Sequence, residues 1–379
     1  MNRHWVALLV VVVIVEAFVI GYLVDTNNRL SGDLGELQGK YQELLSKYEL
    51  VTTVQYPLKL VDDANRVVVI KSEPQRIVSM APSTTEILFA LGLDDRVVGV
   101  TYYCNYPPEV NELKERGRLA VIGGYWTPDV EKIVAVRPDL VIGYASVPSH
   151  VRVAERLESM NVTVLLLFPR HLNDVFDNIV LVGKACGKLK EAQELVQQLR
   201  ARVERVVERV RGLPKVKVYF ELWFDPLMSA GPGTFIDDLI GLAGGENIFH
   251  DAQSSWPVVD SEQVIIRNPD VIVLPDKYMS DYNVSIEDVK SRPGWQAISA
   301  VKNNRIYFIN DDMIFRPGPR LVDALEFLAK YIHPEALRAI SVVVDDRAYS
   351  IGDVISKLML AGYASQVYNT HSCPEALSA

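Results

Sequence analysis

The stretch DVEKIVAVRPDLVI at residues 129–142 is repeated in altered form as DSEQVIIRNPDVIV at residues 260–273. Both copies read Asp-x-Glu, a short apolar-rich run, Pro-Asp and then a β-branched segment. A second repeat precedes the first in each half, because Ser-x-x-Pro-x-Thr begins at Ser79 and again at Ser229. Since the two repeats come in the same order, the sequence predicts two similar lobes. A two-lobed body has a cleft, and small ligands commonly bind where domains meet.

Strand and helix patterns alternate on both sides of one long helical stretch, which predicts an α/β fold with mostly parallel strands. Before that stretch the patterns predict strands at 67–70, 76–80, 97–102, 140–142 and 162–167 and helices at 83–91, 129–136 and 154–160. After it they predict strands at 218–222, 271–274 and 306–309 and helices at 235–243, 261–266 and 320–332. Ser83 or Thr84 is expected to cap the first helix, and Gly92 to end it.

The long stretch at residues 188–211 combines strong helix formers with apolar residues at helical spacing. Because it separates the two repeats, it is expected to bridge the lobes as a rigid helix that limits hinge opening. The expected organisation is a transmembrane anchor (1–25), a helical stalk (26–55), an N-terminal α/β lobe (56–170), bridging helices (171–215), a C-terminal α/β lobe (216–333) and an extension with no assigned role (334–379).

The N-terminus carries an apolar run at residues 6–23, interrupted only by Glu16. Its length of about 18 residues is near the minimum for a bilayer span. No small-x-small cleavage site or nearby cysteine follows, so an uncleaved anchor is favoured over a signal peptide. The leucines and tyrosines at 30, 34, 37, 41, 44 and 48 then show heptad spacing, which fits either a short coiled coil or an amphipathic helix lying on the body.

Composition argues against several classes of function. The 379 residues are 49% hydrophobic with a net charge of −9, and nucleic-acid binders instead display clustered Lys and Arg. Cys104, Cys186 and Cys373 form neither a disulfide framework nor a zinc motif, and the six histidines are dispersed singly, so no metal site is expected. No nucleophile–base set or phosphate-binding loop is apparent, so the chain is not expected to be an enzyme.

Three motifs carry a family resemblance: SMAPSTTEILFALG at 79–92, VGVTYYCNYPPEV at 98–110 and GGENIFHDAQSSWPVVDSEQV at 244–264. They resemble the periplasmic binding proteins of ABC importers for cobalamin, ferric siderophores and haem, and look most like the cobalamin-binding members. The resemblance covers residues 76–333 and implies two α/β lobes joined by one long helix. It also implies an extracytoplasmic receptor without a cofactor that delivers its ligand to a permease dimer. With the apolar run at residues 6–23 as its anchor, such a receptor is expected to be tethered to the cell membrane.

Matched by position to this family, a mostly aromatic set is expected to face the ligand. A large flat macrocycle needs broad apolar walls, and aromatic rings supply them at low entropy cost. The positions fall at the carboxyl ends of strands or in the loops that follow, where α/β sheets bind ligands. The alternative is that these loop aromatics are buried against their own lobe. The set is Tyr103, Tyr125, Trp126, Tyr144, Trp256 and Met228, the last standing where the family has phenylalanine.

Glu131 and Glu262 match the family's docking glutamates, which pair with arginines on the two permease subunits. One carboxylate at the same place in each repeat suits a roughly two-fold permease dimer. The alternative is that both are ordinary first-turn residues favoured by the helix dipole.

Other readings of the sequence remain beside the cobalamin receptor. A ferric-siderophore or haem receptor needs cations for anionic ligand groups, and Arg170, Arg316 and Arg320 are the candidates. A cleft enzyme is disfavoured because the repeated Asp-x-Glu carboxylates fall in different lobes. A purely structural surface protein is disfavoured by the aromatic set.

Overall fold

The computed structural model describes residues 39–41 and 53–337 of the chain. Contacts divide the chain after Ala336 into two compact units, and the first unit contains both large β-sheets. Its described part opens with an antiparallel hairpin of β1 (Leu58–Val61) and β2 (Val67–Ile70).

The N-terminal sheet has five parallel strands in the order β5-β4-β3-β6-β7. All positions of β4 and β6 are buried, because helices and loops cover both faces, as is usual for parallel sheets. The strands are β3 (Ile77–Ser79), β4 (Val97–Val100), β5 (Ala120–Val121), β6 (Leu140–Tyr144) and β7 (Thr163–Leu167). The helices that alternate with them are α2 (Pro82–Ala90), α3 (Glu109–Glu115), α4 (Val130–Ala135) and α5 (Pro148–Ser159).

The C-terminal sheet has four parallel strands in the order β10-β8-β11-β12, with β9 antiparallel to the end of β8. The strands are β8 (Val216–Phe224), β9 (Leu227–Ser229), β10 (Gly245–Asn247), β11 (Val271–Pro275) and β12 (Ile306–Ile309). The helices are α8 (Phe235–Leu242), α9 (Ser261–Arg267), α10 (Lys277–Tyr282), α11 (Ile286–Lys290), the short 3-10 turn η1 (Trp295–Ala297), α12 (Ser299–Lys302), α13 (Asp311–Ile314), α14 (Leu321–Ile332) and α15 (Pro334–Leu337).

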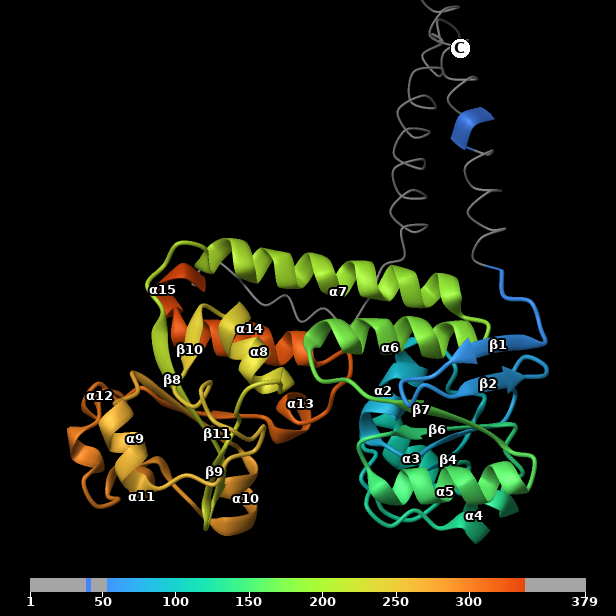
Figure 1. Cartoon of the computed structure of the whole chain (residues 1–379), viewed down its shortest axis with the longest axis horizontal. Helices are drawn as coiled ribbons and strands as arrows, with labels where there is room; N and C mark the ends of the chain where they lie inside the picture. Colours follow the sequence, from blue (N-terminus) through green and yellow to red (C-terminus); the bar gives the residue numbers. More distant parts are fainter. Residues whose placement is uncertain (1–38, 42–52, 338–379) are drawn as a thin grey trace, which may run out of the picture. The chain divides into compact units, whose positions relative to one another are not determined.

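Two long helices separate the sheets in the sequence, α6 (Leu172–Ala185) and the 22-residue α7 (Leu189–Val210), and they lie side by side in Figure 1. Helix α7 buries a stripe at three- and four-residue spacing that includes Ala192, Val196 and Leu199. A Cβ on Gly183 of α6 would come within 2.4 Å of the Ala192 Cβ, so glycine permits this close approach of the helices.

The sequence repeat marks equivalent helix starts. Asp129 and Asp260 are the N-caps of α4 and α9, and each carboxylate accepts hydrogen bonds from backbone N–H groups of the first turn. One turn later, Ile133 and Val264 are fully buried and anchor the helices to their own sheets.

The second part of the repeat marks equivalent strand starts. Arg137 and Asn268 adopt left-handed conformations with φ of 47° and 48°, which turn the chain from helix to strand. The N–H of Asp139 donates to the Arg76 carbonyl at 2.9 Å, and the N–H of Asp270 donates to the Lys217 carbonyl at 2.8 Å. Both aspartate carboxylates accept N–H groups of the same neighbouring segment in return. The repeated letters therefore specify the same helix–turn–strand unit twice.

The strands and helices expected from the sequence are all present, although α5 begins earlier than expected, at Pro148. The expected cap of α2 is wrong. The N-cap is Ala81, without a side-chain hydrogen bond. Pro82 takes the first helical position, where its missing N–H leaves no bond unmade, so Ser83 and Thr84 lie inside the helix and are buried.

Three expected segments lie largely outside the described residues: the anchor at 1–25, the stalk at 26–55 and the extension at 334–379. Within residues 39–41 and 53–337, no helix has the length and apolar character required to span a bilayer.

Candidate functional site

Two aromatic loops meet at the carboxyl edge of the N-terminal sheet. Tyr102 and Tyr103 follow β4, with ring centroids 4.3 Å apart. The Tyr102 N–H donates to the Gly123 carbonyl, 3.0 Å away in the loop after β5. A Cβ on Gly124 would lie 2.6 Å from the Tyr102 hydroxyl, so a larger residue would push the loops apart. The fold thereby places the Tyr103 loop against the loop after β5.

The loop after β5 carries one exposed and one half-buried ring. Trp126 is 64% exposed, and Tyr103 in the neighbouring loop is 44% exposed. Tyr125 is half-buried and meets Trp126 edge-on, with centroids 4.6 Å apart. Burial raises the pKa of Tyr125 to about 12. The two loops therefore present a neighbouring set of aromatic rings.

Tyr144 ends β6 and is buried. Its hydroxyl shares a 2.8 Å hydrogen bond with the Ser83 hydroxyl on α2. Burial raises the pKa of Tyr144 above that of a free tyrosine. In this conformation its ring offers almost no surface to a ligand, in contrast to Tyr103 and Trp126.

His150 on α5 links two of these aromatic segments, and sequence reasoning missed it. Its Nδ1 accepts the Tyr144 N–H at 3.0 Å, so its Nε2 carries the proton and donates to the Tyr125 carbonyl at 2.7 Å. Its ring also lies edge-on to the Tyr125 ring, with centroids 5.1 Å apart. Burial lowers the pKa of His150 to about 4, which keeps the ring neutral. No sequence signal distinguished this single histidine from the other five.

The C-terminal sheet presents its own aromatic surface. Trp256 lies in the loop after β10, is 40% exposed, and meets Phe235 edge-on with centroids 6.4 Å apart. Met228 lies in β9, is half-buried, and forms an isolated antiparallel bridge with Val258 two residues beyond Trp256. The structure thus brings the segments of Met228 and Trp256 together.

A further aromatic cluster stands at the end of β8. Trp223 and Phe224 lie with centroids 5.0 Å apart, and the exposed Tyr282 contacts both rings edge-on at 5.2 and 5.3 Å. Sequence reasoning missed this cluster because the strand was expected to end at Leu222. The Trp-Phe pair directly after an apolar strand was the available signal.

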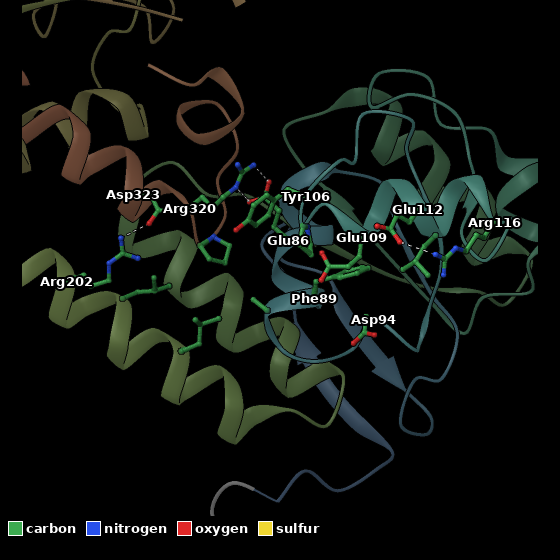
Figure 2. Close-up of a pocket in the computed structure, with 16 residues that line it drawn as sticks. Glu86, Phe89, Asp94, Tyr106, Glu109, Glu112, Arg116, Arg202, Arg320 and Asp323 are labelled. Carbon is green, nitrogen blue, oxygen red and sulfur yellow. Dashed lines mark hydrogen bonds and ion pairs between the residues drawn. The ribbon is translucent and has the colours of Figure 1, made fainter. Parts of the chain in front are cut away.

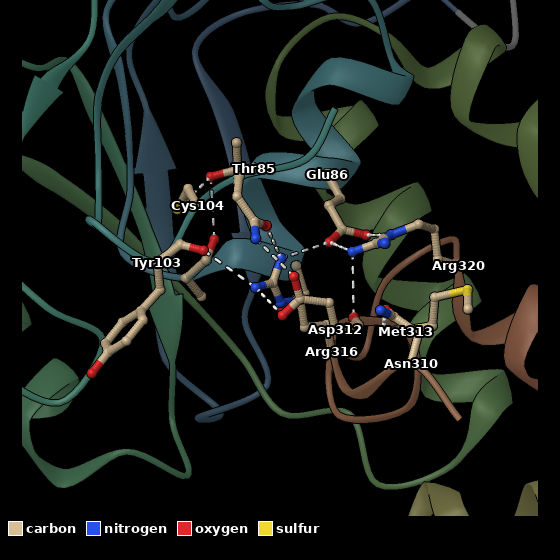
Figure 3. Close-up of polar contacts among 12 residues, drawn as sticks. Thr85, Glu86, Tyr103, Cys104, Asn310, Asp312, Met313, Arg316 and Arg320 are labelled. Atoms are coloured by element: carbon tan, nitrogen blue, oxygen red, sulfur yellow. Dashed lines mark hydrogen bonds and ion pairs between the residues drawn. The ribbon is translucent and has the colours of Figure 1, made fainter. Parts of the chain in front are cut away.

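A polar cluster connects the two sheets of the unit (Figure 3). Asn105, after β4, donates to Asp312 of α13 at 2.8 Å. Arg320 donates twice to Glu86 of α2, at 2.9 and 2.6 Å. Arg316 contacts Asn105, Asp312 and Glu86. These arginines, two of the three candidates for an anionic ligand, are thus engaged with protein carboxylates. The third, Arg170, is exposed and lies 5.7 Å from the Phe168 ring centroid.

Two surface cavities lie away from the expected ligand-facing residues. One, of about 690 Å³, is lined by α2, α3, α7 and the start of α14 (Figure 2), and its apolar lining residues include Phe89, Leu199 and Pro319. The other, of about 810 Å³, lies beside α8 and β10. Neither of these two cavities is lined by any of the six residues expected to face the ligand.

Glu131 and Glu262 are both exposed second residues of their helices, α4 and α9. Within residues 39–41 and 53–337, neither carboxylate forms a hydrogen bond or an ion pair. Both are therefore available to a partner, in keeping with either the docking or the helix-dipole explanation.

Comparison with known proteins identifies the class. Residues 77–313 match the family described as periplasmic binding protein. The ABC transporter substrate-binding lipoprotein YvrC of Bacillus subtilis is 33% identical over 292 residues, 76% of this chain and 88% of the relative. A vitamin B12-binding protein of Vibrio cholerae is 29% identical over 259 residues, 68% of this chain and 89% of the relative.

Solved structures agree with the family match. The vitamin B12-binding protein BtuF of Vibrio cholerae superposes with a TM-score of 0.59 at 28% identity, covering 69% of this chain and 97% of that one. The haem-binding protein RhuT of Roseiflexus superposes with a TM-score of 0.61 at 28% identity, covering 69% of this chain and 99% of that one. The chain belongs to the periplasmic binding proteins, the solute-binding components of ABC importers. The family and these relatives bind solutes, which confirms that the chain is not an enzyme.

Proposed function

We propose that this protein captures cobalamin in a cleft between two α/β lobes joined by α7, and delivers it to the permease of an ABC importer. The observation that carries the ligand assignment is the likeness to vitamin B12-binding proteins, in sequence and in structure, over most of the described chain. Residues 77–313, which match the periplasmic binding protein family, include the positions at which the ligand-facing aromatics are expected.

The exposed aromatic loops support this ligand. Tyr103 and Trp126 from the N-terminal half, and Trp256 from the C-terminal half, leave large ring areas in contact with water. Exposed rings of this size are costly unless a partner covers them, and a corrin macrocycle has the flat apolar area to do so. Met228 and the Trp223–Tyr282 cluster would extend the second wall. The buried Tyr144 contributes by supporting the first wall rather than by direct contact.

The membrane tether and the docking glutamates complete the proposal. The apolar run at residues 6–23 would hold the body outside the cytoplasm, close to the permease. The name of the relative YvrC includes the word lipoprotein, which is in keeping with a tether for this chain. Glu131 and Glu262 would then pair with arginines on the two permease subunits.

A haem or ferric-siderophore ligand is the second candidate, because relatives in the same family include the haem-binding RhuT and a possible iron-binding protein of Staphylococcus epidermidis. Such ligands carry anionic groups. Arg316 and Arg320 are already engaged with Glu86 and Asp312, which favours the neutral corrinoid.

Calorimetric titration of the purified full-length protein in detergent with cyanocobalamin, haem and a ferric siderophore tests the proposal. Saturable one-to-one binding of cyanocobalamin, tighter than that of the other two ligands, is expected. Tighter binding of haem or of the ferric siderophore would replace the first candidate with the second.

A further inference from the structure

The buried carboxylate of Glu86 occupies a position where an anionic ligand group could be held. Its side chain, on α2, is only 2% exposed. Arg320 donates to the Glu86 carboxylate through Nε and Nη2 at 2.9 and 2.6 Å, and Arg316 Nη1 lies 3.5 Å from the same carboxylate (Figure 3). This fork geometry is how arginine binds carboxylates in general. Glu86 therefore fills a carboxylate-binding site built by the segment before α14.

The cluster is balanced in charge. Arg316 pairs with Asp312 as well as with Glu86, so two guanidinium groups meet two carboxylates. Arg316 further donates to the Asn105 side chain at 2.5 Å and to the Tyr103 carbonyl at 3.3 Å. Arg316 thus contacts the backbone of the loop whose Tyr103 ring is exposed.

An anion approaching this cluster would meet arginines whose donors are already used. The side chains of Arg316 and Arg320 remain 12% and 13% exposed. Glu86 and Arg320 also line the 690 Å³ cavity shown in Figure 2, so small solutes can reach their edge. To bind there, a ligand carboxylate must displace Glu86, which is held within the protein at high effective concentration.

From this geometry we infer that Glu86 determines specificity: its carboxylate occupies the Arg316–Arg320 pair and makes the site select a neutral ligand over an anionic one. The inference rests on the proposed function, because it assigns the charge class of the same ligand. Removing the Glu86 charge leaves the Arg316–Arg320 pair with one positive charge that Asp312 does not balance, so a ligand carboxylate is then favoured beside it.

The test compares Glu86→Gln with the wild-type full-length protein, using haem, which carries two propionates, and neutral cyanocobalamin as probes. The matched control is Glu112→Gln, which removes the carboxylate from the exposed Glu112–Arg116 ion pair. Both of these residues line the same cavity. Glu86→Gln is expected to bind haem at least about 10-fold more tightly than wild type, the scale of a hydrogen bond to a charged group. The affinity of Glu86→Gln for cyanocobalamin should stay within about threefold of the wild-type value. Glu112→Gln should change neither the haem affinity nor the cyanocobalamin affinity.

Unchanged haem affinity in a folded Glu86→Gln protein overturns the inference, as does an equal gain in Glu112→Gln. If Glu86→Gln does not fold, Glu86→Asp keeps the charge but shortens its reach, and a smaller gain in haem binding is expected. No gain in that variant is equally contradictory. The proposed function fails separately, when wild-type protein does not bind cyanocobalamin, because the haem comparison between variant and wild type does not depend on that result.

Discussion

Glu131 and Glu262 occupy the same place in two equivalent structural units. Each is the second residue of a short helix whose N-cap is an aspartate, Asp129 or Asp260. Each is exposed, while the residue two positions later is fully buried against its own sheet. The same capped helix therefore holds one outward carboxylate in each half, an arrangement that suits a partner with two similar subunits.

Replacing both glutamates with lysine should abolish delivery to the importer without changing ligand affinity. Lysine should be more damaging than alanine, because it places like charge against the arginines proposed on the permease. The measurement is binding of the loaded receptor to the importer in nanodiscs, at low and at high salt. Wild-type binding should weaken as salt rises, since exposed ion pairs are screened.

Glu155→Lys is the matched control for this experiment, because it reverses an exposed carboxylate on α5 that is not part of the repeat. Normal importer binding by the Glu131→Lys/Glu262→Lys double variant would show that the two residues are only favourable helix-start residues.

Trp256→Ala should weaken cobalamin binding by about 1–3 kcal/mol, the usual cost of removing an aromatic anchor. The fold should be unaffected, because the ring is 40% exposed and projects from a loop. Titration and thermal unfolding of the same samples separate the two effects. Phe327→Ala removes an exposed ring from α14 and should leave affinity unchanged. A Trp256→Ala protein that binds like wild type removes Trp256 from the site.

Acidification should destabilise the protein through His150. The unfolded chain binds the proton near pH 6.5, whereas burial keeps the folded pKa at about 4. The neutral ring therefore contributes stability above pH 6.5 that is lost as the pH falls towards 4, by at most about 3 kcal/mol. Urea unfolding at pH 7 and 4.5 measures this loss, which should be smaller in His150→Gln than in the wild-type protein. Equal losses in the two proteins would contradict the role of His150.

Arg292→Met should destabilise the C-terminal half by about 3–5 kcal/mol, because it leaves the buried Glu221 carboxylate unpaired. Arg292 donates to both Glu221 oxygens, at 2.6 and 2.8 Å. Arg116→Met, which breaks the exposed pair with Glu112, should cost less than about 1 kcal/mol. Chemical denaturation of both variants measures the loss of unfolding free energy. Similar losses would show that burial does not determine how much the Glu221–Arg292 pair contributes to stability.

The sequence predicted the fold well where local patterns repeat. The unit at residues 129–142 has the same type of N-cap and the same strand contacts as the unit at 260–273. The repeated residues therefore specify the same backbone conformation in both units. The cap of α2 was mispredicted because Pro82 shifts the helix start by one residue. Helix α3 was missed, since its residues were not recognised as a separate apolar pattern, whereas α6 falls within the bridging helices expected at 171–215.

The candidate site was less predictable, because it depends on contacts between distant residues. Tyr103 and Trp256 were proposed only from their match in position to the family, and both are exposed in the structure. Nothing in the sequence showed that His150 would join the Tyr125 and Tyr144 segments, or that Glu86 would meet arginines more than two hundred residues away. Such pairs arise only when the sheets and their loops are assembled.

The crystal structure of the protein with bound cobalamin tests the central claim most directly. The account predicts the corrin ring between the Tyr103–Trp126 loops and the Trp256 loop, with the Glu86–Arg320 pair intact behind Tyr103. Cobalamin bound instead in the cavity lined by Phe89 and Leu199, or a Glu86–Arg320 pair broken by the bound ligand, would contradict it.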